Sequence, residues 1–195
     1  QLMHEEAQRL RILFDQMQLL NKLQQQQLKI RRQLTDLRTF LSKAVAKYAP
    51  IADAKALSLS ATIPHTPTLY VAVDHALLQH LLDILVNQAL RFAPAQTTVQ
   101  LALTTTLASP LQTTTSTVGA LPAVQVTVTD QGPPLTMRIL DNIYENVEQW
   151  DLLAPERPGL GVSLALCKMI AEIHDGHLTI ASNPTEGITV AVALP

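Results

Sequence analysis

The feature that most constrains the fold is a long apolar-periodic stretch, DHALLQHLLDILVNQALRF, at residues 74–92. Its apolar side chains recur at spacings of three and four, which is the period of an α-helix with one buried face. Asp74 is a favourable N-cap residue, and Pro94 stops a helix that reaches Phe92. Strand-like stretches lie on both sides of this helix, so the sequence predicts a layered fold of helices and strands.

Alternating stretches rich in Val, Thr and Leu predict the strands of this fold. The predicted strands are a weak one around residues 28–34, then 56–63 and 70–73, and two pairs, 99–103 with 124–128 and 178–181 with 188–194. The pattern of helices and hairpins predicts an α+β fold, a two-layer α/β sandwich with a mixed sheet.

Two further helices are predicted around the helix at 74–92. One begins at Leu37 after a Thr35-Asp36 cap and ends before Pro50. The other covers residues 164–173, is opened by Gly159-Leu160-Gly161 and ends at Gly176.

Two segments lack a clear period. Residues 104–122 are rich in Thr, Ser, Gly and Pro and are expected to form an exposed loop. Residues 130–158 are expected to be irregular, with a short helical piece at 137–150 and a short, proline-stiffened end before Gly159.

The N-terminal segment, residues 2–28, is a separate amphipathic helix. Its stripe consists of Leu10, Leu13, Phe14, Met17, Leu20 and Leu23. An apolar stripe on an otherwise polar helix favours pairing with a partner helix, so a homodimer through this helix is expected. The predicted division is a partial dimerisation helix at 1–27 and one domain at 28–195.

Composition excludes several classes of protein. Of 195 residues, 47% are hydrophobic and 15% charged, enough for one core with an appended element. Fourteen Lys and Arg against sixteen Asp and Glu give a net charge of -2, which provides no basic excess for nucleic acid or anionic membranes. The single cysteine excludes an internal disulfide and fits a reducing compartment. No apolar run is long enough to span a membrane. The sequence begins at Gln1 inside a helical pattern, so it is expected to be part of a longer protein.

Three stretches, in order, resemble the nucleotide-binding boxes of sensor histidine kinases, whose fold is shared with gyrase, Hsp90 and MutL-type ATPases. Residues 74–92 are similar without gaps to the helix that carries the family's asparagine-rich box. VTVTDQGPPL at 126–135 resembles a strand followed by the Asp-x-Gly-x-Gly box, and GLGVSLALCKMIAEIHDG at 159–176 resembles the second glycine box. Residues 5–24 are similar to the second helix of the dimerisation domain, which distinguishes histidine kinases from other members of the fold.

The resemblance implies a site for ATP and Mg²⁺. Asp130 would accept a hydrogen bond from the adenine amine, and glycines would let the backbone approach the phosphates at a helix N-terminus. The residues implied as cofactor-binding are Gln88, Arg91, Asp130, Gly132, Gly159, Gly161 and Ser163. His80 stands where the family has a polar residue that helps to position the attacking group, although an ordinary half-buried histidine is an equally good interpretation.

The boxes also depart from the family pattern. Ile84 and Gln88 stand where the family has two asparagines, the second of which is the expected Mg²⁺ ligand. Gln88 keeps an amide oxygen but adds a methylene, which disturbs the strict octahedral geometry of Mg²⁺. A shift of register to Asn87 fails because that residue points away from the buried face. Pro134 and Ser163 each replace a glycine of the family boxes.

Three functions are therefore compatible with the sequence. The resemblance favours the first, the C-terminal core of a cytoplasmic two-component sensor histidine kinase, within a larger sensor protein, which phosphorylates an upstream histidine from ATP and relays the phosphoryl group to a response regulator. The second is a catalytically impaired pseudokinase that acts as a dimerising and docking module. The third, a non-kinase ATPase or serine-kinase relative of the same fold, is disfavoured by the helix at residues 5–24.

Overall fold

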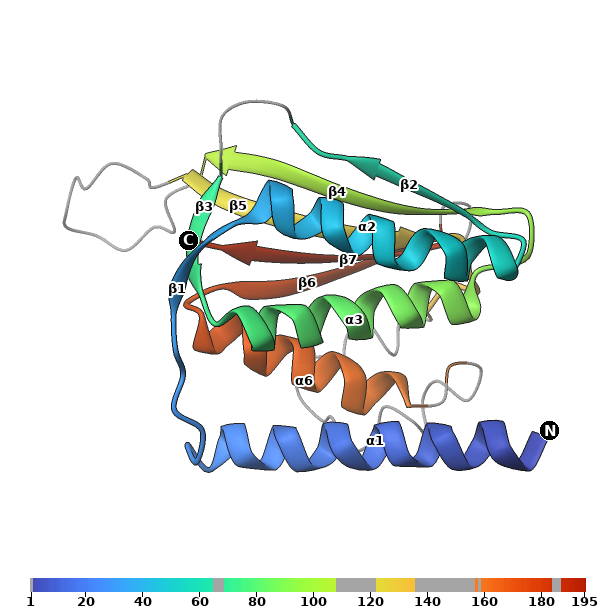
Figure 1. Cartoon of the computed structure of the whole chain (residues 1–195), viewed down its shortest axis with the longest axis horizontal. Helices are drawn as coiled ribbons and strands as arrows, with labels where there is room; N and C mark the ends of the chain where they lie inside the picture. The colour runs from blue at the N-terminus through green and yellow to red at the C-terminus, as the bar shows by residue number, and fades with distance from the viewer. Residues whose placement is uncertain (1, 65–68, 108–121, 136–156, 158, 184–186) are drawn as a thin grey trace.

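The structure, a computed structural model, describes residues 2–64, 69–107, 122–135, 157, 159–183 and 187–195 (Figure 1). Its helices in this part of the chain are α1 (Leu2–Gln24), α2 (Leu37–Ala54), α3 (His75–Phe92) and α6 (Leu160–Ile173). Its strands are β1 (Gln33–Asp36), β2 (Ser58–Thr62), β3 (Tyr70–Val73), β4 (Thr98–Leu107), β5 (Pro122–Asp130), β6 (His177–Asn183) and β7 (Gly187–Leu194). No helix among these residues is long and apolar enough to cross a membrane.

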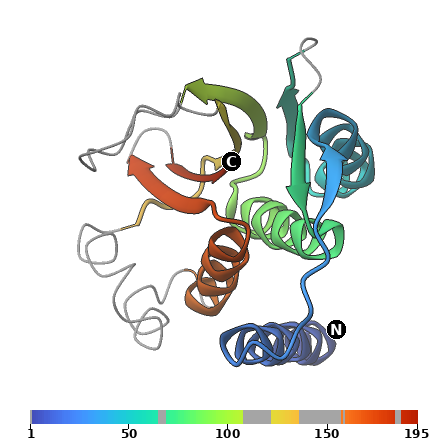
Figure 2. The ribbon, with the colours of Figure 1, turned by 90° about the vertical axis from the view of Figure 1, so that its left-hand side faces the viewer.

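The main sheet has five strands in the order β2-β4-β5-β7-β6. β2 and β4 are parallel, whereas the other neighbours are antiparallel, so the sheet is mixed. β1 and β3 form a separate antiparallel pair. The helices α2, α3 and α6 form the second layer of the sandwich, and α1 lies beyond α6, on its far side from the sheet (Figure 2). The predicted two-layer sandwich with a mixed sheet is confirmed.

One core joins the two layers. The alternation along β5 and β7 directs every second side chain towards the helices, and Val126 lies opposite Val192 in the ladder. The largest fully buried side chains are Leu37, Leu41, Tyr48, Leu81, Leu82, Leu90, Leu101, Leu103, Leu164, Leu166 and Ile170. Both predicted strand pairs in the C-terminal half form as expected.

The predicted end of the second helix was wrong. Pro50 lies inside α2, which continues to Ala54. A proline removes one helical hydrogen bond, but the last turn still buries Ala52 completely against the rest of the core. This burial holds the helix together beyond the proline.

The predicted exposed loop at 104–122 was too long. β4 extends to Leu107 and β5 begins at Pro122, and Thr104 to Leu107 pair with Gln125 to Pro122. Threonine is β-branched and fits a strand as well as a loop, so composition alone misassigned these residues. The remainder of that loop and the predicted helical piece at 137–150 lie outside the described residues.

Other boundaries moved by a few residues. The glutamine run at 24–27, which could either extend the first helix or form a polar link, does not extend it: α1 ends at Gln24, and Gln26 adopts a positive φ of 54° where the chain turns. The first strand covers Gln33–Asp36, which is later than expected. α6 already begins at Leu160, directly after the Gly159 N-cap.

Candidate functional site

The matched boxes meet where α3, the end of β5 and the start of α6 come together (Figure 1). α3 begins at the predicted cap, because the Asp74 carboxylate accepts hydrogen bonds from the backbone N–H groups of Ala76 and Leu77. α3 packs on both β5 and α6. Residues from all three boxes line one cavity, including Gln88, Asp130 and Leu160.

Asp130 is buried at the end of β5 and already has partners. Its Oδ1 accepts a hydrogen bond from the Gly132 backbone N–H at 2.7 Å. The same oxygen lies 2.9 Å from Nη2 of Arg157, and Oδ2 lies 3.4 Å from Nη1. The carboxylate predicted to accept from adenine therefore holds a guanidinium group.

The glycine box at the start of α6 adopts the backbone geometry that requires glycine. Gly159 is the N-cap, with φ of 84°, in the left-handed region that L side chains rarely adopt. A Cβ on Gly159 would lie 2.8 Å from Cδ2 of Leu13, a residue of α1. α1 thus covers the turn that the resemblance assigns to phosphate. Gly161, two residues after Gly159, is also buried.

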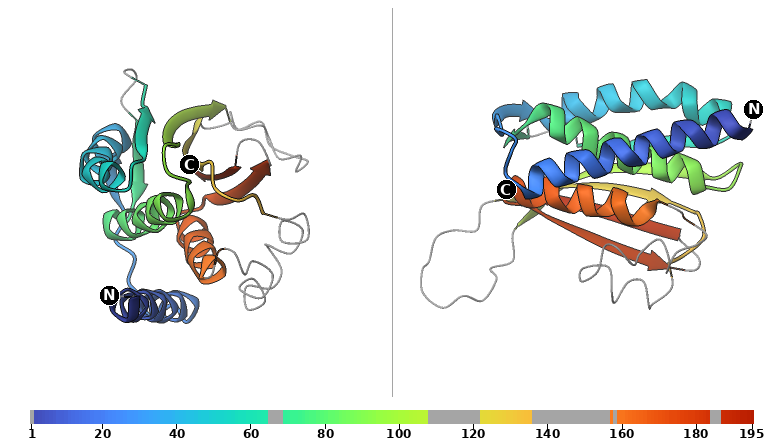
Figure 3. Two further views of the ribbon diagram at one scale, coloured as in Figure 1. Left: turned by 90° about the vertical axis from the view of Figure 1, so that its right-hand side faces the viewer. Right: turned by 90° about the horizontal axis from the view of Figure 1, so that it is seen from below.

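α1 also reaches the site through a chain of hydrogen bonds. Nε2 of Gln88 donates to Oγ of Ser163 at 2.9 Å, and that hydroxyl donates to Oε1 of Gln16 at 2.9 Å. Gln16 is a buried polar residue of α1. Gln88 and Ser163, two of the residues predicted to bind the cofactor, are therefore adjacent, and both are linked to α1. Figure 3 shows α1 lying alongside α6.

The residues present do not fit a Mg²⁺ ion. Mg²⁺ requires six oxygen ligands in octahedral geometry and usually keeps several waters. Oε1 of Gln88 is buried without a partner among the described residues, but the cavity that Gln88 lines has a volume of about 20 Å³. That space holds about one water, and the cationic Arg157 also lines it. The described residues contain no group of three or more His, Cys, Asp or Glu side chains that could hold a metal.

The remaining residues of the first box lie apart from this cavity. Ile84 is part of the core, and Asn87 is exposed, as its helical position predicts. Asn87 donates to the carbonyl of Asp83 on its own helix. Arg91 is exposed, with its guanidinium carbon 4.9 Å from the centre of the Phe92 ring. Neither Ile84 nor Asn87 lines the cavity next to Asp130.

His80 belongs to a different pocket. It is half-buried and lines a space of about 310 Å³ between α1, the segment after α1 and the start of α3. Burial lowers the pKa of His80, against the opposing effect of Asp83 and Asp15. Its Nε2 is buried without a hydrogen-bond partner among the described residues. The His80 side chain does not line the cavity that Gln88 and Asp130 line.

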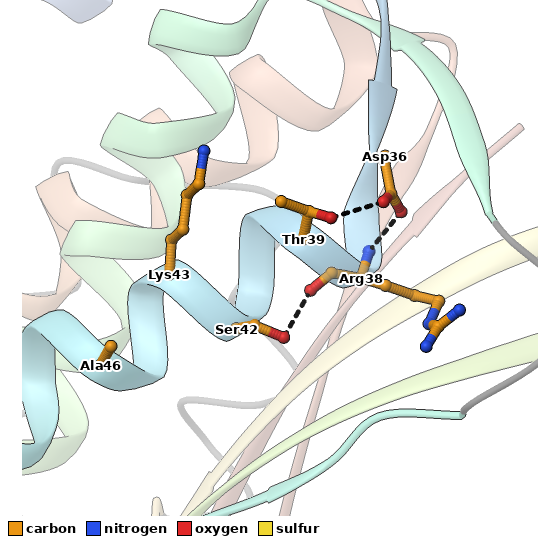
Figure 4. A pocket seen from close by; sticks show the side chains of 6 residues that line it. All are labelled: Asp36, Arg38, Thr39, Ser42, Lys43 and Ala46. Atoms are coloured by element: carbon orange, nitrogen blue, oxygen red, sulfur yellow. Dashed lines mark hydrogen bonds between the residues drawn. The ribbon is translucent and has the colours of Figure 1, made fainter.

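A wider pocket, of about 430 Å³, lies at the start of α2 (Figure 4). Its polar side chains already serve the helix: Asp36 accepts from the Arg38 backbone and the Thr39 hydroxyl, and Ser42 donates to the Arg38 carbonyl. The Thr39 hydrogen bond is the largest cause of the lowered pKa of Asp36. None of the predicted site residues lines this pocket, so it belongs to the capping of α2.

Sequence reasoning missed two residues of the site. Arg157 stands alone between prolines in a segment without a period, so nothing in the sequence marked it. Gln16 did leave a signal, because it lies three residues after Leu13 and four before Leu20, on the apolar side of its helix. The expected stiff segment before Gly159 lies outside the described residues, apart from Arg157.

Comparison with known proteins places these features in a family. Residues 73–195 match the family model described as histidine kinase-, DNA gyrase B-, and HSP90-like ATPase. The adaptive-response sensory kinase SasA of Synechococcus sp. is 26% identical over 170 residues, which are 87% of this chain and 41% of that protein. The sensor-like histidine kinase SenX3 of Mycobacterium tuberculosis is 26% identical over 161 residues, 82% of this chain and 35% of that protein. The chain thus spans less than half the length of either relative.

Solved structures share the fold. Full-length ShkA in complex with AMPPNP superposes with a TM-score of 0.72 at 18% identity, over 98% of this chain and 36% of that chain. The histidine kinase AdeS of Acinetobacter baumannii gives a TM-score of 0.69 at 15% identity, over 97% of this chain and 80% of that chain. At these identities the likeness concerns the fold alone.

Proposed function

Because this chain belongs to the histidine kinase-, DNA gyrase B-, and HSP90-like ATPase family, we propose that it is the core of a two-component sensor protein whose ATP-binding fold no longer catalyses phosphotransfer. In this role the domain is a dimerising and docking module, with weak or no binding of Mg²⁺-nucleotide. Such a protein works in the cytoplasm and passes its signal to a response regulator through contact.

The observation that carries this proposal concerns Ile84 and Gln88, the two residues that stand where the family has its box asparagines; we call these the metal-box positions. Ile84 is a core residue with no ligand atom, and the Gln88 amide donates to Ser163 beside a cavity of about 20 Å³. Small-molecule sites usually have volumes of about 300–1,000 Å³. Phosphoryl transfer depends on positioned metal ions that neutralise charge on the phosphates, so loss of the metal site removes the main source of catalysis.

The alternative, an active kinase, is favoured by the residues that the boxes retain. Asp130, Gly132, Gly159 and Gly161 stand at matched positions, and Gly159 has the positive φ expected of its turn. If active, the domain would transfer the γ-phosphoryl group of ATP to a histidine upstream. The two functions differ in one measurable property, the Mg²⁺-dependent binding of a nucleotide.

The test is calorimetric titration of the chain with AMPPNP, with and without Mg²⁺. The proposal expects no Mg²⁺-dependent heat for the wild type. A variant that combines Ile84→Asn with Gln88→Asn restores both amides and serves as the matched control for the metal site. Micromolar, Mg²⁺-dependent binding by the wild type would overturn the proposal in favour of the active kinase.

Dimerisation has its own support in α1. Leu10, Phe14 and Met17 are 66%, 60% and 50% exposed and lie on one side of the helix, whereas Leu13 faces Gly159. Part of the predicted stripe therefore packs on the chain's own domain, and the exposed part remains available for a second copy of α1.

The dimer is tested by charging this exposed side. We expect Phe14→Glu combined with Met17→Glu to give a folded monomer in light scattering, because two carboxylates would be buried in a helix pair. Ile12→Glu is the matched control, because Ile12 is also an exposed apolar residue but lies on the opposite side of the helix, and it should leave the dimer intact. An unchanged molar mass for the double variant would contradict dimerisation through this side of α1.

A further inference from the structure

A buried ion pair lies at Asp130, the residue that the resemblance assigns to the adenine base. The family boxes do not predict this pair. The side chains of Arg157 and Asp130 are 3% and 7% exposed, and Nη2 lies 2.9 Å from Oδ1. Burying two opposite charges is unfavourable unless their geometry is good and further hydrogen bonds satisfy them. Here the second guanidinium nitrogen and the Gly132 N–H also bind the same carboxylate. We call this arrangement the buried pair.

The guanidinium also stacks on an aromatic ring. The guanidinium carbon of Arg157 lies 4.8 Å from the centre of the Phe92 ring, at the end of α3. A planar cation over an aromatic face is attracted by the ring electrons. The group next to Asp130 is therefore planar, donates hydrogen bonds in its own plane and stacks on a ring, and these are also properties of an adenine base.

Little space remains beside the buried pair. The cavity lined by Asp130, Arg157 and Gln88 has a volume of about 20 Å³, enough for about one water. A Cβ on Gly132 would lie 2.3 Å from Nη2 of Arg157, so the glycine is needed for the close approach of the guanidinium. An adenine ring and the Arg157 side chain cannot occupy this space together.

We propose that Arg157 occupies the base end of this pocket as an internal ligand of Asp130, and that an adenine ring binds only after the buried pair has opened. This inference rests on the proposed function and deepens it, because it names the contact that excludes the nucleotide. The metal-box positions explain the loss of Mg²⁺, whereas the buried pair acts on the base and does not involve a metal.

The proposal has a quantitative consequence. If adenine binds only to the open form, its apparent dissociation constant equals the intrinsic one divided by the fraction of molecules that are open. Removing the guanidinium makes the open form permanent. It also leaves a cavity shaped for a planar hydrogen-bond donor next to an unpaired carboxylate.

The experiment uses two probes, adenosine and methylguanidine, without Mg²⁺. Arg157→Ala is titrated with each by calorimetry, and the melting temperature is followed at low-millimolar ligand. We expect both probes to bind the variant and to compete with each other, and adenosine to bind about ten-fold or more tightly than to the wild type. GDP, without the adenine amine, should not reproduce the effect.

Two controls accompany the variant. Arg32→Ala removes another arginine paired with an aspartate, Asp175, at the other end of α6, and should bind both probes no more tightly than the wild type does. Adding Asp130→Asn to Arg157→Ala removes the negative charge of the carboxylate that both probes would contact. This change should weaken the binding of the cationic methylguanidine. Since Arg157→Ala leaves a buried carboxylate unpaired, its circular dichroism spectrum must first show a folded chain.

Arg157→Lys decides the matter if Arg157→Ala does not fold. Lysine keeps a positive charge near Asp130 but is a point donor that cannot form both in-plane bonds or cover the Phe92 ring in the same way. Adenosine should then bind more tightly than to the wild type. Unchanged adenosine affinity in the folded variants would overturn the internal-ligand proposal and leave the pseudokinase proposal intact, whereas Mg²⁺-AMPPNP binding to the wild type would overturn the latter.

Discussion

The two ends of helix α6 each have an arginine paired with an aspartate, but in opposite surroundings. Before the N-terminus, the buried pair of Arg157 and Asp130 has side chains 3% and 7% exposed. After the C-terminus, Arg32 and Asp175 form an exposed pair, with side chains 39% and 68% exposed and a separation of 2.5 Å. The shorter distance belongs to the weaker interaction, because water screens the exposed charges and solvates them when they separate. Burial, not distance, decides what such a pair does.

The other contacts of the two ends sharpen the difference. The N-terminal end is linked to α1 through Ser163 and Gln16. The C-terminal end is held by His174, which is buried at the helix C-cap. His174 Nδ1–H donates to the Ile170 carbonyl, and its Nε2 accepts from the Asp74 backbone N–H. The C-terminal end is thus fixed to α3 through the His174 ring, whereas the N-terminal end has the buried charges of Arg157 and Asp130 beside it.

The largest effect is expected from removing one partner of the buried pair. Asp130→Ala should lower the free energy of unfolding by about 3–5 kcal/mol, because the Arg157 charge stays buried without a counter-charge. Urea denaturation followed by circular dichroism measures this loss. Asp175→Ala is the matched variant at the other end of α6, and an equal loss for the two would remove the distinction between the ends.

The C-terminal end should respond next most strongly, through His174. His174→Ala removes two hydrogen bonds and leaves a cavity, so we expect a loss of about 2 kcal/mol in the free energy of unfolding. The exposed His177 lies three residues later, and His177→Ala should have almost no effect. Comparable denaturation midpoints for the two histidine variants would contradict the anchoring role of His174.

Ser163→Ala tests the link between the N-terminal end and α1. It leaves the side-chain amide of Gln88 and Oε1 of Gln16 without their shared partner, so we expect the free energy of unfolding to fall by about 1 kcal/mol. Hydrogen exchange should become faster in α1, since its buried polar contact with α6 is lost. The exposed Ser60→Ala is the control. Unchanged exchange in α1 would show that Leu13 and its neighbours hold the helix without this contact.

The smallest effect concerns the exposed pair and is best seen as a pH dependence. A hydrogen bond from Arg32 lowers the pKa of Asp175 below its usual value of 3.8. Because the folded pKa is depressed, the contribution of this pair is present above about pH 4 and is lost as the pH falls through the folded pKa. Arg32→Ala should flatten this part of the acid-unfolding curve slightly, and added salt should reduce the difference. A salt-insensitive difference would indicate that the pair is not solvent-screened.

Most of the fold could be read from periodicity. The helix at 74–92, its Asp74 cap and both C-terminal strand pairs follow from local patterns that the structure keeps. The errors arose where a residue type suits two structures, as threonine does in β4, or where packing overrides a local preference, as it does at Pro50. Local sequence does not contain the energy of contacts with distant segments.

The candidate site divides in the same way. Sequence alone determined where the first box departs from the family pattern, because Ile84 has an apolar side chain and Gln88 carries one methylene more than asparagine. Only the tertiary structure decided what fills the space instead. Arg157 and Asp130 are 27 residues apart, and Gln16 and Ser163 are 147 apart. Contacts across such separations depend on how the layers pack and which charges that packing removes from water, and no local pattern encodes them.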